Sequence, residues 1–356
     1  MLVTGREAGS ATTERWRQLH DEALVWLIHD HFYHRLDANL AMAEGGVTAK
    51  TVVPIGDLAV YNDSDAGEDD LAFYERTLKQ TEGWAKESLI RLERARLLYE
   101  SRPDRFVIAS NADDVFRAKA AGKAAIFLGC EGCKAFEGRL ELLRAFHRLG
   151  VRQMQLIWAR PNQLVDVSAT GAWRLSGFGR DAVALMNELG VVIDLSHAPW
   201  TLFDDVTALS RQPVIVSHGA PNMVFPRSGD MSGAHLDALK ACGGLLGLHF
   251  CRHYINGPFA TFEDFLRVVD YLVGQGYEDT VALGGDLFEV DSYFRARHPP
   301  PGGATHETWS VFIEEIGDVR RIPAITRALV ERGYPERTTR SILGENALRV
   351  YRSVMG

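Results

Sequence analysis

The sequence predicts an α/β protein folded as a (β/α)8 TIM-like barrel, and two observations predict it. Eight apolar runs of strand length follow one another along the 356 residues, and helical patterns lie between most of them. Most runs are continuous rather than alternating, which is typical of strands buried on both faces of a parallel sheet. Eight alternations of strand and helix favour a closed barrel. The runs cover residues 24–28, 51–55, 125–129, 153–157, 191–195, 214–217, 245–250 and 281–284.

Apolar residues at helical spacing predict helices over 140–149, 179–189, 202–209, 235–242 and 262–273, with Gly190 as a C-terminal stop. The stretch 63–105 begins with an acidic tract at 63–70 and continues as an amphipathic run, for which we expect a helix on the barrel wall. The Pro/Gly-rich segment 298–304 follows the last strand, where it suits a lid or an active-site wall. No repeat or low-complexity linker interrupts residues 1–356, so a single domain is expected.

The composition excludes several classes of partner. The net charge of -8 and the lack of a basic tract argue against nucleic acid. No segment is apolar for long enough to cross a bilayer, and the N-terminus lacks the apolar run of a secretory signal, so a cytoplasmic protein without a membrane partner is expected. The pair Cys130 and Cys133 has no second close pair to complete a zinc ribbon, because Cys242 and Cys251 are too widely spaced, which favours buried thiols over a redox or zinc site.

Histidines and carboxylates follow five of the eight predicted strands. In barrels of this kind catalytic groups lie at the C-terminal strand ends. Each residue alone has an ordinary explanation, such as a hydrogen-bonded histidine or a helix N-cap, but their conjunction at one end favours a metal site. Neutral imidazoles and carboxylates bind Zn²⁺ and similar cations. Four histidines and a glutamate are enough for two ions that share one carboxylate, with an aspartate left to move a proton. These residues are His29, His31, Glu131, His197, His218 and Asp286.

Several motifs, taken in order, resemble those of one known family over nearly the whole chain. The chain resembles the membrane dipeptidase (renal dipeptidase, peptidase M19) family of amidohydrolase-like barrels. The matching segments are 129–132 (GCEG), 142–146 with 149–152, 186–187 with 189–190, 194–197 (DLSH), 213–218 (PVIVSH), 227, 243–244, 284–286 (GGD), 343–346 (LGEN) and 348–350.

The resemblance implies a binuclear zinc site and a role for several residues. Glu131 would bridge the two divalent ions, and His197 and His218 would bind one of them. Arg227 would hold the substrate carboxylate, for which a guanidinium fork is suited. Asp286 would shuttle a proton during peptide cleavage.

Two positions depart from the family pattern. His31 stands where the family has an aspartate, which replaces an anionic ligand with a neutral one and could favour a different metal. Trp158 stands near the position of a family histidine that polarises the scissile carbonyl, and an indole can donate one hydrogen bond but cannot ligate metal. We therefore expect Trp158 to line a substrate pocket that differs from that of an ordinary dipeptidase.

The favoured hypothesis is a metal-dependent hydrolase that uses a metal-bound hydroxide to cleave an amide of a dipeptide or an N-acyl amino acid, a small molecule that bears a carboxylate. One alternative is an enzyme that acts on a lactone, an ester or a non-peptide amide, or that catalyses a non-hydrolytic step. Another is a non-catalytic metal- or ligand-binding barrel. The sequence leaves open whether the chain forms a homodimer.

Overall fold

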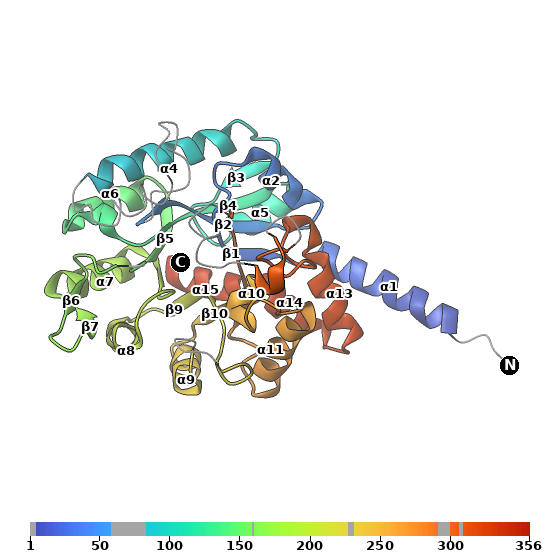
Figure 1. The fold of residues 1–356 in the computed structure, drawn as a ribbon. Coiled ribbons are helices and arrows are strands. Elements are labelled where there is room, and N and C mark those ends of the chain that lie inside the picture. The colour runs from blue at the N-terminus through green and yellow to red at the C-terminus, as the bar shows by residue number, and fades with distance from the viewer. Residues whose placement is uncertain (1–4, 58–82, 159, 227–230, 291–299, 306–308) are drawn as a thin grey trace.

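The computed structural model describes residues 5–57, 83–158, 160–226, 231–290, 300–305 and 309–356, with side chains from residue 14 onward. Eight parallel strands close into a barrel that the helices surround (Figure 1). The ring closes because β11 pairs with β1 and β2 pairs directly with β4. Its strands are β1 (Trp26–Asp30), β2 (Ala49–Gly56), β4 (Ala124–Glu131), β5 (Val151–Gln155), β8 (Val192–Asp194), β9 (Val214–Gly219), β10 (Leu245–His249) and β11 (Val281–Leu287).

All eight predicted strands are confirmed, and three further strands were not predicted. Strand β3 (Phe106–Ile108) pairs with the first half of β4, whereas β5 pairs with the second half, so β3 stays outside the ring. Strands β6 (Val165–Val167) and β7 (Trp173–Leu175) form a separate antiparallel hairpin. Each of these strands has only three residues, which is too short to give a periodic pattern.

The five predicted helices are confirmed with small shifts at their ends. Helix α7 begins after Ser176, whose side chain accepts from the Gly179 amide, and it ends at Gly190, which has a left-handed φ of 70°. The predicted wall helix is α4, which packs on β2 and β3, whereas the acidic tract before it lies outside the described residues. The helices are α1 (Gly5–Glu22), α2 (Leu36–Leu40), α4 (Trp84–Glu100), α5 (Asp114–Ala120), α6 (Leu140–Arg148), α7 (Gly177–Leu189), α8 (Trp200–Leu209), α9 (Gly233–Ala241), α10 (Arg252–Ile255), α11 (Phe262–Gly274), α13 (Pro323–Glu331), α14 (Glu336–Arg340) and α15 (Asn346–Met355).

The described residues also form five short helical turns: η1 (Ala41–Ala43), η3 (Lys134–Phe136), η4 (Pro301–Gly303), η5 (Val319–Arg321) and η6 (Ser341–Glu345). The turn η4 belongs to the Pro/Gly segment 298–304, of which residues 298 and 299 lie outside the described residues. All four cysteines are free thiols, and Cys130 and Cys133 are buried in the core. No helix within the described ranges has a stretch long and apolar enough to cross a membrane.

Aromatic side chains fill the N-terminal end of the barrel. Trp26 of β1 stacks on Phe127 of β4 with ring centroids 4.6 Å apart, and Tyr351 of α15 lies 4.5 Å from Trp26. The Tyr351 hydroxyl contacts Thr51 and donates to the side chain of Gln153. The packed rings of Trp26, Phe127 and Tyr351 close this end of the barrel interior.

Two glycines allow β9, β10 and β11 to approach closely. A Cβ atom on Gly247 would lie 2.0 Å from the Ser217 carbonyl oxygen, and one on Gly284 would lie 2.6 Å from the same atom. Any larger residue at either position would force the backbones of these neighbouring strands apart. The two glycines therefore fix the place of Ser217 in the barrel interior.

A buried ion pair joins β1 to β2 beside the histidines of the first strand. The Lys50 Nζ atom lies 3.0 Å from Asp30 Oδ1, and each side chain is only 1% exposed. The same Asp30 oxygen accepts from the Phe32 amide at 2.7 Å. Burial lowers the pKa of Lys50, and the adjacent Asp30 carboxylate opposes that shift.

We predict that Asp30→Asn destabilises the metal-free protein by about 3–5 kcal/mol, because it leaves the Lys50 ammonium buried without a counter-charge. The double variant Asp30→Asn/Lys50→Met should recover a large part of that loss. Urea unfolding measures both. The control is Asp104→Asn, which breaks the exposed Arg102–Asp104 pair and should cost no more than about 1 kcal/mol. Equal losses in Asp30→Asn and the control would contradict the prediction.

Candidate metal centre

The structure brings together the six predicted residues at the C-terminal end of the barrel. His29 lies in β1, Glu131 ends β4, His218 lies in β9 and Asp286 lies in β11. His31 and His197 come one and three residues after β1 and β8. The predicted Arg227 lies outside the described residues. Since all these strands run in parallel, their C-terminal ends meet at one place, as the strand-end argument requires.

Glu131 lies between two pairs of histidines. The Nε2 atoms of His29 and His31 are 3.3 Å apart, and those of His197 and His218 are 2.9 Å apart. Glu131 Oε2 lies 3.6 Å from His31 Nε2, while Oε1 lies 3.3 Å from His197 Nε2. Oε1 also lies 3.8 Å from His29 Nε2 and 3.9 Å from His218 Nε2, so this one oxygen is near histidines of both pairs.

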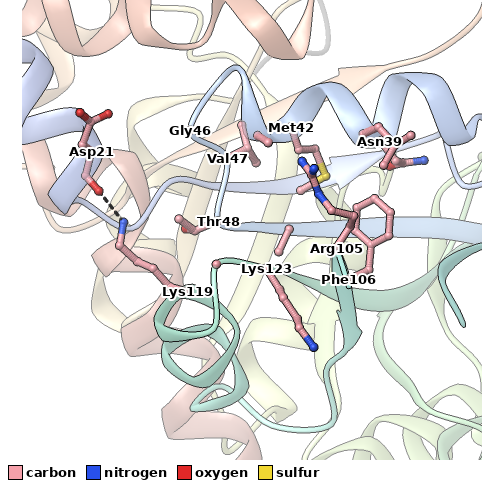
Figure 2. A pocket seen from close by; sticks show the side chains of 14 residues that line it. Asp21, Asn39, Met42, Gly46, Val47, Thr48, Arg105, Phe106, Lys119 and Lys123 are labelled. Atoms are coloured by element: carbon pink, nitrogen blue, oxygen red, sulfur yellow. Dashed lines mark hydrogen bonds between the residues drawn. The ribbon is translucent and has the colours of Figure 1, made fainter. Parts of the chain in front are cut away.

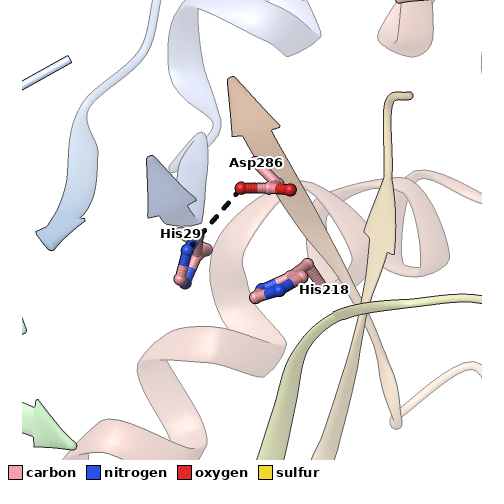
Figure 3. A group of neighbouring side chains, drawn as sticks. All are labelled: His29, His218 and Asp286. Atoms are coloured by element: carbon pink, nitrogen blue, oxygen red, sulfur yellow. Dashed lines mark ion pairs between the residues drawn. The ribbon is translucent and has the colours of Figure 1, made fainter. Parts of the chain in front are cut away.

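Three groups of side chains in the described part of the chain have ligand atoms within 4.8 Å of one another, as a metal ion requires. Two of them share Glu131, one with His29 and His31 and the other with His197 and His218. The third joins Asp286 to His29 and His218, and Figure 3 shows the three side chains converging from different strands. The donor set of imidazoles and carboxylates suits zinc and similar divalent ions.

One carboxylate oxygen of Asp286 faces this cluster. Its Oδ1 atom lies 3.0 Å from His31 Nε2 and 3.7 Å from His29 Nε2. It is nonetheless buried without a hydrogen-bond partner of acceptable geometry among the described residues. A buried carboxylate oxygen without a partner is costly, so this atom fits a site completed by a cation or its water.

A buried carboxylate, Asp194, organises the hydroxyl groups behind the histidines. Every partner of Asp194 is a donor: the Ser196 and Ser217 amides, the Ser196 hydroxyl and the Gln153 side chain. Because the Ser196 proton goes to Asp194, the contact of 3.1 Å between Ser196 and Ser217 must use the Ser217 proton.

The Ser217 oxygen can then only accept from the two histidines that it touches. It lies 3.2 Å from His29 Nδ1 and 2.9 Å from His218 Nδ1. The one assignment that satisfies every contact gives both rings a proton on Nδ1 and a lone pair on Nε2. We call the chain Asp194–Ser196–Ser217 the hydroxyl relay. It turns the lone pairs of His29 and His218 toward the cluster, as metal ligands require.

Burial and the charges of the cluster shift the pKa values of its ionisable groups in different directions. Burial lowers the pKa of His29, and it lowers that of His218 well below the ordinary value, so both rings are neutral as the relay requires. Burial also lowers the pKa of His31, but Glu131 and Asp286 outweigh burial and raise it to about 9. Burial raises the pKa of Glu131, but His31 and His197 outweigh it and hold this pKa below its ordinary value.

Two residues of the cluster have strained backbone. His197 and Asp286 have left-handed φ angles of 62° and 52°. Such angles in residues other than glycine cost on the order of 1–3 kcal/mol and gather at functional sites. With this backbone, the side chain of Asp286, within β11, and that of His197, just after β8, both turn toward the barrel mouth.

Sequence reasoning missed two buried residues near the cluster. His249 ends β10 and lies 3.0 Å from Asp286, but it was counted within an apolar strand. Asp57 follows β2 and accepts from the Lys134 amide, so it holds the turn after Glu131, and burial raises its pKa to about 7. The strand-end rule, applied to the predicted strand 51–55, would have found Asp57, whereas His249 lay inside the predicted strand 245–250.

A cavity of about 450 Å³ opens beside the cluster, a size that suits a small ligand. Its lining includes His197, His218 and His249, together with apolar side chains such as Trp200 and Met231. Trp158 lies edge-to-face with His197, with ring centroids 6.2 Å apart, so it borders the cluster.

A second cavity of about 330 Å³ lies at the opposite, N-terminal end of the strands (Figure 2). Lys119 lines it and donates to the backbone oxygen of Asp21 at 2.8 Å, a contact drawn in Figure 2. No residue of this cavity belongs to a metal-binding group found in the described ranges. The candidate metal-binding groups of the described residues thus all lie at the C-terminal end.

Comparisons with known proteins agree with this geometry. Residues 57–293 match the family model described as membrane dipeptidase (peptidase family M19). The chain is 30% identical over 306 residues to dipeptidase tcpJ of Claviceps purpurea (strain 20.1), which covers 83% of this chain and 65% of the relative. It is 28% identical over 264 residues to dipeptidase verJ of Clonostachys rogersoniana, over 72% of this chain and 62% of the relative. The chain thus spans less than two thirds of either fungal protein.

A solved structure shares the fold over nearly the full length of both chains. An amidohydrolase from Pseudomonas aeruginosa superposes with a TM-score of 0.79 at 24% identity, covering 96% of this chain and 99% of that one. The family model matches well over half of the sequence, and the barrel and its buried cluster of histidines and carboxylates are in place. The chain belongs to the membrane dipeptidase family, peptidase family M19.

Proposed function

We propose that the protein is a metal-dependent dipeptidase that hydrolyses the amide bond of a dipeptide or an N-acyl amino acid. The observation that carries the proposal is Glu131 between two histidine pairs, with the Oδ1 atom of Asp286 beside them. Family membership and the dipeptidase names of the two fungal relatives support the same reaction. A metallo peptidase from Rhodobacter sphaeroides with the same fold, at a TM-score of 0.75, binds a phosphinate mimic of the dipeptide L-Ala-D-Ala.

The proposed cofactor is a pair of divalent ions, with zinc the expected metal. His29 and His31 would hold one ion, His197 and His218 the other, and the Glu131 carboxylate would be shared between the two sites. Ions bound there would lower the pKa of a water molecule and polarise the scissile carbonyl.

Side chains of the protein carry the remaining proposed roles. When water adds to the carbonyl carbon, Asp286 Oδ1 would accept the proton that is released and pass it to the nitrogen of the departing amine. The carbon–nitrogen bond breaks and a carbon–oxygen bond forms, which gives a carboxylic acid and an amine. Arg227 would hold the substrate carboxylate, and Trp158 would contact the substrate beside His197.

A second candidate is hydrolysis of a lactone, an ester or a non-peptide amide. It is favoured by Trp158, because an indole beside His197 cannot supply the cationic or metal-binding group that a histidine supplies. A panel of dipeptides, N-acyl amino acids, lactones and esters distinguishes the two candidates by kcat/KM.

We predict that Glu131→Gln lowers the content of bound metal and abolishes hydrolysis, because it removes the ligand that both ion sites share. Metal analysis and dipeptide hydrolysis are measured on one preparation. The matched control is Glu188→Gln on the exposed face of α7, which should change neither quantity. Turnover at the normal rate by fully metal-free wild-type protein would refute the metal-dependent mechanism.

Arg227→Ala should raise KM for substrates with a free carboxylate by roughly 10–150-fold, the equivalent of about 1.5–3 kcal/mol for a charge-assisted hydrogen bond. Matching substrates with an amidated C-terminus should show no such change. Arg211→Ala, an exposed arginine before β9, serves as the control. An unchanged KM for free-carboxylate substrates removes this role from Arg227.

Ser217→Ala should weaken zinc binding by about 10–100-fold, because His29 and His218 then lose the acceptor that fixes their tautomers. Competition with a chromogenic chelator measures this affinity without reference to activity. Ser168→Ala removes an exposed hydroxyl and should leave the affinity unchanged. Wild-type affinity in a folded Ser217→Ala protein would show that the hydroxyl relay does not prepare the ligands.

A further inference from the structure

His249 is a buried histidine that none of the proposed roles uses. It is the last residue of β10, is 2% exposed, and lies outside the three metal-binding groups found in the described part of the chain. Its Nε2 atom lies 3.0 Å from Asp286 Oδ2. It therefore contacts the carboxylate oxygen that faces away from His31 and His29.

The backbone fixes the tautomer of His249. The Cys251 amide donates to Nδ1 at 3.2 Å, so Nδ1 carries a lone pair. A neutral ring then has its proton on Nε2, where it can donate to Asp286 Oδ2. Tyr254 stacks on the ring with centroids 4.2 Å apart and an angle of 16° between the planes. These contacts thus fix the direction of the His249 N–H bond and the plane of its ring.

Both ring nitrogens of His249 are engaged, which determines what the residue can do. With Nδ1 accepting from Cys251 and Nε2 donating to Asp286, no lone pair remains for a metal ion. The contact uses only Oδ2 of Asp286. It leaves Oδ1 facing His29 and His31, where it has no hydrogen-bond partner among the described residues.

We propose that His249 is a positioning residue that sets the orientation of the Asp286 carboxylate for proton transfer. By donating to Oδ2, it prevents rotation of the carboxylate and keeps Oδ1 directed at the cluster. This inference rests on the proposed function, because it explains how Asp286, the proposed proton acceptor, is oriented. His249 itself neither binds metal nor carries the proton.

A matched pair of variants tests the role of the N–H group. Methionine and glutamine have similar length and shape, and both lose the stacking on Tyr254, but only glutamine keeps a donor near the position of Nε2. We expect His249→Met to lower kcat on the order of 10–100-fold with KM and metal content unchanged. His249→Gln should recover most of the lost kcat. A merely structural role would affect both variants alike.

The comparison with Asp286→Asn separates this inference from the proposed function. Asp286→Asn should lower kcat on the order of 10²–10⁴-fold, and adding His249→Met to it should cause little further loss, because both changes act on one carboxylate. Full activity of Asp286→Asn would refute the role of Asp286 in the proposed function.

Three other outcomes overturn the inference about His249 alone. They are normal kcat in His249→Met while Asp286→Asn is impaired, equal losses in the Met and Gln variants, and loss of bound metal in proportion to activity. Thermal unfolding of each variant identifies any loss that comes from the fold, and a folded His249→Gln protein decides the question if His249→Met does not fold.

Discussion

The arrangement of the cluster depends on one buried carboxylate, Asp194. It accepts four hydrogen bonds, from Gln153 of β5, from the backbone and hydroxyl of Ser196 after β8, and from the Ser217 amide of β9. A buried charge is tolerated only when its lone pairs are satisfied, and here three neighbouring strands contribute the donors. Because those donors are fixed, the protons of the two serines are also fixed, and so are the tautomers of His29 and His218.

The same principle of proton placement operates on the other side of the cluster. There a backbone amide, that of Cys251, determines the tautomer of His249, and His249 determines which oxygen of Asp286 is free. Two sets of groups outside the centre of the cluster, the hydroxyl relay and the Cys251–His249 pair, thus set the orientation of its side chains. The left-handed backbone at His197 and Asp286 shows that the fold tolerates local strain to keep this arrangement.

The sequence was sufficient to predict the barrel and the positions of the cluster, because both follow from patterns along the chain. Continuous apolar runs mark buried parallel strands, and the residues that follow them must meet at one end of a closed ring. The hydroxyl relay could not be predicted, because a serine after a strand has no pattern that reveals its partner on another strand. His249 was missed for a related reason: it lies within the predicted apolar run 245–250, and only the contact with Asp286 distinguishes it from a residue of the core. The roles of the predicted ligands, of Trp158 and of Arg227 remain predictions.

The closure of the ring has a consequence for folding. His29 lies on the first strand and Asp286 on the last, and these two strands are neighbours only after β1 pairs with β11. Contacts between such distant parts of a chain form late and slowly, because the entropy of closing a long loop opposes them. A chain whose barrel is still open would offer a cation only part of the ligand set. Metal that binds the closed barrel alone would draw the folding equilibrium toward it by mass action, so cation supply could influence how much of the newly made protein reaches the native state.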